Sequence, residues 1–126
     1  MKNKTKVLIR LVVILAVGIG IWITVSASRG PGTLDAFASC LKEKGATFYG
    51  AFWCPHCQNE KKMFGSSQKF LPYVECSTPD GQNQLPICKE KHINGYPTWE
   101  FVDGTRESGE VSLKVLSEKT SCALLQ

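Results

Sequence analysis

Blocks of apolar and polar residues along the chain predict one long apolar helix followed by a small α/β domain. Residues 7–25 are almost wholly apolar, a length that can cross a bilayer. Residues 33–45 carry apolar positions at helical spacing, where Thr33 can cap the helix and Gly45 can end it. Residues 47–52 are rich in β-forming types and apolar on both faces, which predicts a buried strand.

The rest of the chain continues this alternation of strand and helix. Helices are predicted over 56–64, over 85–92 and from Ser112 onward. Strands are predicted over 73–76 and 98–102, the second opening a hairpin. This order predicts an α/β domain with a central mixed sheet and helices on its faces. The expected core residues of the helices are Leu34, Phe37, Leu41, Met63, Phe64, Leu113, Leu116 and Leu124.

Charge divides the chain in the same place as hydrophobicity. Four basic residues before position 28 account for the net charge of +4, and residues 28–126 hold 11 basic and 11 acidic side chains. This balance argues against a nucleic-acid surface, which needs a clustered basic excess. We therefore expect an anchor or signal segment over 1–27, a linker over 28–32 and one folded domain over 33–126.

The N-terminal segment also predicts a compartment. Its basic end should stay in the cytoplasm, which places the folded domain outside it, in a periplasm or an equivalent lumen, anchored by one transmembrane helix over 7–25. The same features fit a secretory signal, and Val25-Ser26-Ala27 resembles a cleavage site. A secreted protein cleaved near Ala27 is therefore the alternative.

Six cysteines, all beyond the apolar stretch, carry the candidate chemistry. Cys54-Pro55-His56-Cys57 follows a predicted strand and opens a predicted helix. Unpaired N–H groups and the helix dipole favour an anion there, so we expect the pKa of Cys54 to be lowered. Pro55 suits the first helical turn. A protonated His56 would stabilise the thiolate and make the disulfide a stronger oxidant, with Cys57 as the resolving thiol.

The C-x-x-C spacing also occurs in zinc sites and in structural disulfides. A zinc site needs two further ligands at suitable spacing, and the sequence has no second C-x-x-C. A haem attachment site needs His directly after Cys57, where this chain has Gln58. The spacing favours a redox-active pair, and neither a metal ion nor a cofactor is expected.

The other four cysteines are expected to form structural disulfides. A Cys76–Cys88 bridge would contribute about 3 kcal/mol by chain entropy, and a second, exchange-active pair is the alternative. Cys40 and Cys122 could join the first and last helices of the domain if their Cα atoms lie within about 7 Å. Two buried free thiols or a link to a partner are the alternatives.

A proline directly before the strand at 98–102 needs a special reason, because it cannot donate a backbone hydrogen bond. The Tyr96-Pro97 bond can be cis, which usually marks a tight turn. A trans proline that starts an edge strand is the alternative.

These motifs together resemble the thioredoxin superfamily. The likeness extends over residues 33–121 and is nearest to the thioredoxin-like domain associated with bacterial homologues of vitamin K epoxide reductase. It is carried by Tyr49-Gly50-Ala51-Phe52-Trp53-Cys54-Pro55-His56-Cys57-Gln58, Glu75-Cys76, Cys88, Ile93-Asn94-Gly95-Tyr96-Pro97-Thr98-Trp99-Glu100 and the Phe101-x-x-Gly104 hairpin. The resemblance implies a thioredoxin-like fold over 33–126.

The resemblance also implies a substrate edge and a partner. Pro97 would be cis and pack beside the Cys54–Cys57 pair. The backbone of Tyr96 would then bind an extended substrate peptide by β-type pairing. Trp53, read from the sequence alone, is either a substrate platform or a cap on the core. The substrates would be thiols of exported proteins, and a separate quinone-linked membrane protein resembling vitamin K epoxide reductase would reoxidise the pair.

One position departs from the family pattern. Thioredoxins carry a buried acid six residues before the first cysteine, where this chain has Phe48. Proton transfer to Cys57 would then use water, His56 or Glu60.

The sequence thus favours an extracytoplasmic protein-disulfide oxidoreductase that oxidises its clients. A reductase or isomerase of the same fold, and a non-enzymatic binding or copper-handling module using Cys54, Cys57 and His56, are the alternatives.

Overall fold

The structure is a computed structural model that describes residues 6–7, 9–10, 12–15 and 34–124. The chain divides into two compact units, Met1–Gly30 and Pro31–Gln126. The described residues of the first unit are helical. No helix among the described residues is long and apolar enough to cross a membrane. Most of the predicted anchor or signal over 1–27, the linker over 28–32 and the Thr33 cap lie outside the described residues.

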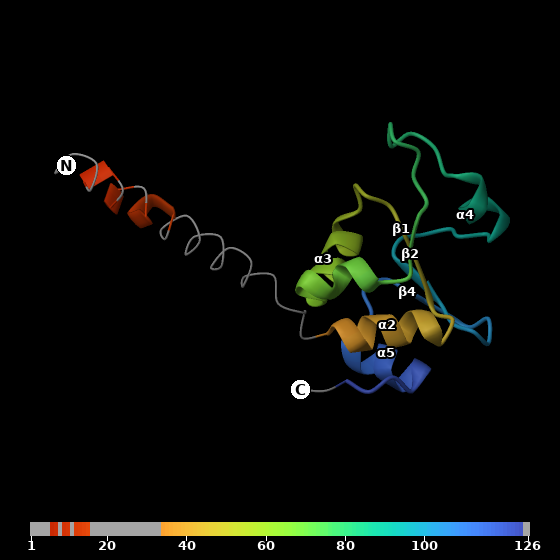
Figure 1. The fold of residues 1–126 in the computed structure, drawn as a ribbon. Coiled ribbons are helices and arrows are strands. Elements are labelled where there is room, and N and C mark those ends of the chain that lie inside the picture. Colours follow the sequence, from red (N-terminus) through yellow and green to blue (C-terminus); the bar gives the residue numbers. More distant parts are fainter. Residues whose placement is uncertain (1–5, 8, 11, 16–33, 125–126) are drawn as a thin grey trace. The chain divides into compact units, whose positions relative to one another are not determined.

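A four-stranded mixed sheet forms the centre of the second unit (Figure 1). The strands lie in the order β2-β1-β3-β4. Strand β1 runs parallel to β2 and antiparallel to β3, and β3 forms a hairpin with β4. The predicted mixed sheet and hairpin are therefore confirmed. The strands are β1 (Thr47–Gly50), β2 (Tyr73–Glu75), β3 (Thr98–Glu100) and β4 (Arg106–Ser108).

Helices cover both faces of this sheet. They are α2 (Asp35–Glu43), α3 (Pro55–Met63), α4 (Pro86–Glu90) and α5 (Leu113–Thr120), with a 3₁₀ helix η1 (Gly65–Phe70) after α3. Neighbouring residues of a strand point to opposite faces, so Phe48 and Tyr49 divide the interior. Phe48 packs in the larger core, which includes buried residues of α2, α3 and α5. Tyr49 packs with Cys88 of α4 in a smaller core on the other face.

The ends of several helices differ from the predicted ones. Helix α4 stops at Glu90, because His92 has a left-handed backbone with φ of 52°. Helix α5 stops at Thr120 for the same reason, since Ser121 has φ of 59°. Leu124 thus lies beyond the helix, although it packs against the larger core. Met63 is 37% exposed, so its predicted core position is wrong, and the 3₁₀ helix η1 has no counterpart in the predicted elements.

Two disulfides join parts of the second unit that are distant in sequence or in fold. Cys40 of α2 is bonded to Cys122, with Cα atoms 5.9 Å apart. Cys76, which follows β2, is bonded to Cys88 of α4, with Cα atoms 5.5 Å apart. Both pairs are among those expected from the sequence.

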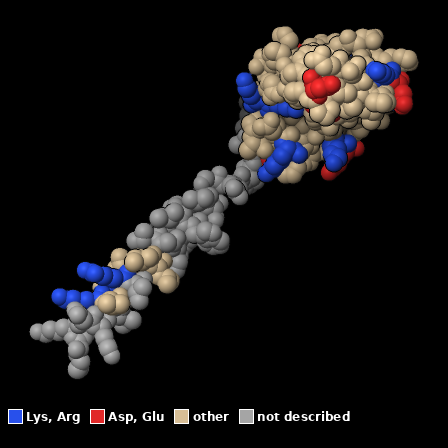
Figure 2. Space-filling view, turned by 90° about the horizontal axis from the view of Figure 1, so that it is seen from above, with Lys and Arg blue, Asp and Glu red and all other residues tan. Residues whose placement is uncertain are grey.

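On the face shown in Figure 2, charged side chains of both signs are interspersed over this unit.

Candidate active site

The C-x-x-C motif lies where the chain leaves β1 and enters α3. Cys54 is the N-cap of α3, and Pro55 occupies the first helical turn. The backbone N–H of Cys57 donates a hydrogen bond to Cys54 Sγ over 3.4 Å. The sulfur of Cys54 therefore accepts a hydrogen bond from one of the N–H groups that a helix leaves unpaired at its start. This is the placement that the sequence predicts.

The two thiols have unequal surroundings. Cys57 is 0% exposed, and burial, helped by the hydrogen bond with Cys54, raises the pKa of its thiol to about 12. At neutral pH the Cys57 thiol is therefore protonated, and a thiol reacts far more slowly than a thiolate. Cys54 borders an open groove instead. This asymmetry suits one attacking and one resolving cysteine.

The Tyr96-Pro97 bond faces the motif from the other side of the groove. It is cis, so the alternative of a trans proline is wrong. The Cys54 thiol donates a hydrogen bond to the Tyr96 carbonyl oxygen over 3.7 Å. Pro97 itself is buried. Both features agree with what the resemblance to thioredoxins implies for this segment.

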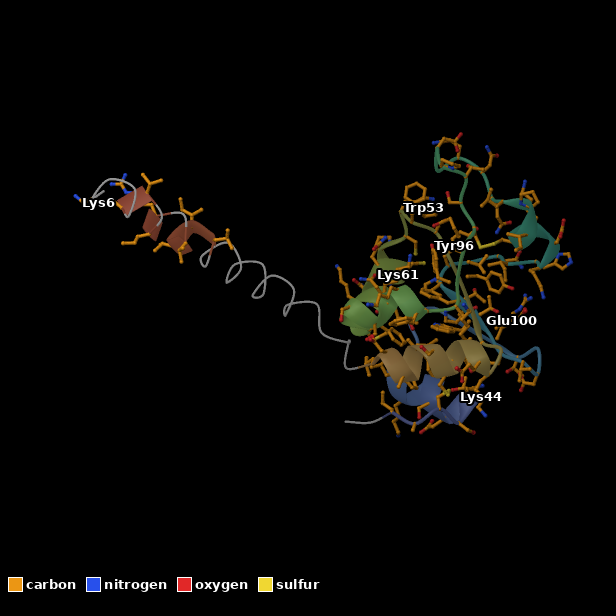
Figure 3. The ribbon with its side chains drawn as sticks, in the orientation of Figure 1. Lys6, Lys44, Trp53, Lys61, Tyr96 and Glu100 are labelled. Carbon is orange, nitrogen blue, oxygen red and sulfur yellow. A yellow bond between two sulfur atoms is a disulfide. The ribbon has the colours of Figure 1, made fainter. Side chains whose placement is uncertain are left out.

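A groove of about 450 Å³ opens beside Cys54. Trp53 stands at its rim with 52% of its surface exposed. Its indole donates a hydrogen bond to Ser77 Oγ over 2.8 Å and meets the Tyr96 ring edge to face, with centroids 6.1 Å apart (Figure 3). The groove is lined by Trp53, Cys54, Pro55, His56, Gln84, Ile93, Asn94, Gly95 and Tyr96.

His56 is exposed at the start of α3 and is oriented by a carboxylate. Its Nδ1 donates to Glu110 Oε1 over 2.6 Å, and this hydrogen bond lowers the pKa of Glu110. Asn59 donates to the same oxygen over 3.1 Å. A positive charge on His56 is therefore partly balanced by Glu110.

Within the described part of the chain, no three His, Cys, Asp or Glu side chains are grouped in a way that could hold a metal ion.

Glu60 lies one turn after Cys57 and is fully buried. Its Oε1 accepts from the Trp99 indole over 3.0 Å, and its Oε2 accepts from the Val111 N–H over 2.8 Å. Burial raises the pKa of this carboxyl group. Both oxygens are thus engaged with β3 and with the segment before α5. That Glu60 carries a proton for Cys57 stays a prediction.

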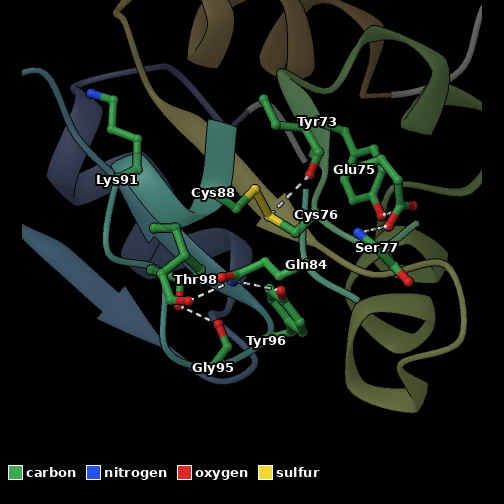
Figure 4. The surroundings of a disulfide bond; sticks show 12 residues. Tyr73, Glu75, Cys76, Ser77, Gln84, Cys88, Lys91, Gly95, Tyr96 and Thr98 are labelled. Atoms are coloured by element: carbon green, nitrogen blue, oxygen red, sulfur yellow. Dashed lines mark hydrogen bonds between the residues drawn. A yellow bond between two sulfur atoms is a disulfide. The ribbon is translucent and has the colours of Figure 1, made fainter. Parts of the chain in front are cut away.

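A polar cluster beside Cys57 is not among the features predicted from the sequence. The cluster consists of Lys61, Tyr73 and Glu75. Tyr73 donates from its hydroxyl to Glu75 Oε2 over 2.7 Å, and Lys61 Nζ lies 3.3 Å from the centroid of the Tyr73 ring. Figure 4 shows Tyr73 and Glu75 near the Cys76–Cys88 disulfide. Two spacings could have indicated it: Lys61 lies four residues after Cys57 on a helix, and Tyr73 and Glu75 are two apart on a strand.

The chain is similar in sequence to a known redox enzyme. No family model matches it. Over 107 residues, or 81% of the chain, it is 43% identical to the thiol-disulfide oxidoreductase LTO1 of Arabidopsis thaliana. The chain spans 28% of the length of that protein. The mixed sheet flanked by helices fits a thioredoxin-like fold, and the similarity to LTO1 supports a relationship to the thioredoxin-like redox proteins.

Proposed function

We propose that this chain is a protein thiol-disulfide oxidoreductase whose Cys54–Cys57 pair exchanges with thiols of other proteins. The observation that carries the proposal is the arrangement of this pair. Cys54 caps α3 at the edge of a groove, 3.7 Å from the Tyr96 carbonyl, and Cys57 is buried behind it. The 43% identity to a thiol-disulfide oxidoreductase supports the same chemistry.

In the oxidising direction, a client thiolate attacks Cys54 Sγ of the oxidised pair. The Cys54–Cys57 bond breaks, a client–Cys54 disulfide forms, and Cys57 leaves as a thiolate that takes up one proton. A second client thiolate attacks the client sulfur of this mixed disulfide, and Cys54 leaves as a thiolate. Two electrons pass from the client to the pair. The client backbone would pair with Tyr96 and lie against Trp53, with the buried Pro97 beneath this segment.

Oxidation rather than reduction of clients is supported by the position of Cys54. An N–H donor and the helix N-terminus stabilise its thiolate, which makes the disulfide a stronger oxidant. His56 adds positive charge when protonated, against the opposing charge of Glu110. We expect a reduction potential above roughly −200 mV in glutathione buffers. A value well below that would assign the chain to the reductases or isomerases.

The His56–Glu110 contact gives this direction a second test. Glu110→Gln leaves a protonated His56 without its counter-charge, so the potential should become more oxidising. His56→Ala removes the positive charge and should make it more reducing. Asn59→Ala, which removes only a second donor to Glu110, is the control and should leave the potential near that of the wild type. Equal potentials for the two His56–Glu110 variants would exclude a role for the pair.

The proposal extends to location and partner. Residues 7–25 would anchor the chain with residues 33–126 outside the cytoplasm, and cleavage near Ala27 is the alternative. Two disulfides in the folded unit support an oxidising compartment, where such bonds persist. A separate quinone-linked membrane protein, resembling vitamin K epoxide reductase, would reoxidise the pair. The mass of the mature protein tests the anchor, because loss of the first 27 residues would rule it out.

Covalent trapping tests the central claim. A Cys57→Ala variant keeps Cys54 and lacks the resolving thiol. A Cys54 thiolate that attacks a client disulfide should therefore stay joined to that client as a mixed disulfide, while the second client sulfur leaves as a thiolate. Mass spectrometry of the reductant-released proteins would identify them. The matched control is the double variant Cys54→Ala, Cys57→Ala, which retains the four structural cysteines. Equal capture by this control would contradict the assignment of the exchange to Cys54.

A further inference from the structure

When the Cys54–Cys57 disulfide breaks, Cys57 leaves as a buried thiolate that needs a charge partner or a proton. Cys57 is 0% exposed and the pKa of its thiol is raised to about 12, so an unaided thiolate there is costly. Phe48 occupies the place where thioredoxins carry an acid. Glu60 is engaged by Trp99 and Val111, and His56 is paired with Glu110. A further polar group approaches the sulfur from another side.

That side is opened by Gly50, at the end of β1. A Cβ added at Gly50 would lie 3.0 Å from Cys57 Sγ, 2.8 Å from Tyr73 Cε2 and 3.4 Å from the Tyr73 hydroxyl oxygen. The sulfur of Cys57 and the ring of Tyr73 therefore approach the same small patch of backbone. Because Gly50 has no side chain, strand β2 brings a polar group to the buried thiol.

Lys61 meets this group from α3. It lies one helical turn after Cys57, on the same helix face, and its Nζ is 3.3 Å from the Tyr73 ring centroid. A cation over an aromatic face is attracted by the ring quadrupole, more so where water is partly excluded. The side chain is half-buried, so its ammonium lies between the interior and solvent.

Glu75 fixes the other end of the cluster. Its Oε2 accepts from the Tyr73 hydroxyl over 2.7 Å, and its Oε1 accepts from the N–H groups of Phe52 at 3.2 Å and Ser77 at 2.9 Å. Three donors hold this carboxylate in place, and it in turn holds Tyr73 beneath Lys61. Burial lowers the pKa of Lys61, while the charges of Glu75 and Cys57 oppose that shift.

We infer that Lys61 is the proton donor and charge partner of Cys57, and that Tyr73 and Glu75 position it. The inference rests on the proposed exchange at Cys54. When a client thiolate attacks Cys54, the electrons of the broken bond leave on Cys57 Sγ. A proton passes from Lys61 Nζ to that sulfur, directly or through one water, which gives a neutral thiol and a neutral amine. The amine then regains a proton from solvent.

The test measures how fast dithiothreitol reduces the Cys54–Cys57 disulfide of the full chain between pH 6 and 10. Rates are divided by the concentration of dithiothreitol thiolate, so that only the protein's own titration remains. Lys61→Met keeps the apolar stem over Tyr73 and removes the charge, and we expect it to be slower by about tenfold or more at pH 7. Lys62→Met, an exposed neighbour on α3, is the matched control and should equal the wild type.

The pH profile separates a proton donor from a packing residue. The groups facing the cluster are Cys54, Cys57, Lys61, Tyr73 and Glu75. The wild-type rate per thiolate should fall at alkaline pH, beginning below 10.5, as Lys61 loses its proton. Lys61→Arg keeps a positive charge but does not give up its proton in this range, so the alkaline fall should disappear. Its rate at pH 7 should lie between those of the wild type and Lys61→Met, because the charge remains and the proton donor is lost. A rate equal to the wild type would overturn the donor role and leave only the charge partner.

Each outcome decides one claim. Equal rates and equal pH profiles for Lys61→Met and Lys62→Met would overturn the role of Lys61, while ordinary exchange in the wild type would leave the proposed function standing. A wild-type disulfide that does not exchange with dithiothreitol at all would overturn the proposed function itself. Thermal unfolding of both variants, expected near the wild-type midpoint, checks that the packing over Tyr73 is retained.

Discussion

At the scale of single residues, Gly50 shows how the absence of a side chain shapes the site. It is buried at the end of β1, and its backbone has no positive φ that would require glycine. The requirement is steric instead, because Cys57 Sγ and the Tyr73 ring both lie within 3.0 Å of the place that a Cβ would occupy. Any side chain at this position would push apart the resolving thiol and the ring beneath Lys61.

Gly50→Ala should therefore destabilise the fold by about 1–3 kcal/mol, the usual cost of adding a group to a packed interior. Chemical denaturation of the reduced protein measures this loss. Gly95→Ala is the matched control, since a Cβ there meets no atom within 4 Å. A Gly50→Ala variant as stable as Gly95→Ala would show that the space between Cys57 and Tyr73 is not filled as the structure has it.

The unequal surroundings of the two thiols predict their order of modification, since both are buried but only Cys54 lines the groove. In reduced protein at pH 7, iodoacetamide should modify Cys54 and leave Cys57 as a thiol, because the pKa of Cys57 is about 12. The rate at Cys57 should then rise about tenfold per pH unit toward that value, as its thiolate fraction grows. Peptide mapping by mass spectrometry measures both sites. Equal modification of the two cysteines at pH 7 would contradict this asymmetry.

At the scale of elements, the segment between β2 and β3 forms one wall of the groove. The Cys76–Cys88 disulfide fixes helix α4 against the end of β2. Gln84 joins the rest of the segment, since its Nε2 donates to the Ile93 carbonyl and to the Tyr96 hydroxyl, both over 2.7 Å. This wall therefore depends on one covalent bond and a few hydrogen bonds, with only a small core beneath it.

Removing each structural disulfide should have a different effect. The double variant Cys76→Ala, Cys88→Ala should lose about 3 kcal/mol of stability and should raise the KM for a dithiol peptide, because the wall of the groove is loosened. The double variant Cys40→Ala, Cys122→Ala opens a much longer loop and should lose about 4.5 kcal/mol, with little change in KM. Equal KM changes in the two variants would contradict a role for the segment in binding.

The predictability of these elements follows from how local their signals are. Strand β1, the start of α3 and the β3–β4 hairpin are each marked by neighbouring residues, and all three are found where expected. The end of α4 depends on the left-handed backbone of His92, for which the sequence gives no glycine signal. The Lys61–Tyr73–Glu75 cluster was missed because it forms only when β2 pairs with β1 beside α3.

At the scale of the whole molecule, Glu60 ties together parts that are far apart in sequence. It joins α3 to Trp99 of β3 and to Val111, just before α5. The indole of Trp99 in turn stacks on Phe48 at the centre of the larger core, with ring centroids 4.9 Å apart. A buried carboxyl group thus holds the redox helix at a fixed position on the sheet.

This burial makes stability depend on pH. The pKa of Glu60 is raised in the folded state above its ordinary 4.5, so the folded protein holds this proton at pH values where the unfolded chain has lost it. The free energy of unfolding should therefore fall as pH rises above 4.5, until the folded carboxyl group has also ionised.

Glu60→Gln should remove this part of the pH dependence. It should also cost about 1–3 kcal/mol, because an amide nitrogen cannot accept from the Trp99 or Val111 N–H. Urea unfolding between pH 4 and 8 measures both effects. Glu118→Gln, at a side chain that is 62% exposed, is the control and should keep the wild-type slope. An unchanged slope in Glu60→Gln would contradict the burial of an ionisable group there.

The bond between Cys40 and Cys122 also has a mechanical consequence. The two residues are 82 positions apart, and all four strands lie between them. Tension applied to the two ends of the chain therefore passes from α2 through the sulfur atoms to the C-terminal end, and the sheet and the redox pair carry none of it. When the oxidised domain is unfolded in a force spectrometer, its contour length should be shorter by about 3.5 Å for each residue between the two bonded cysteines. Reduction of this single bond should release that hidden length and expose the active site to load.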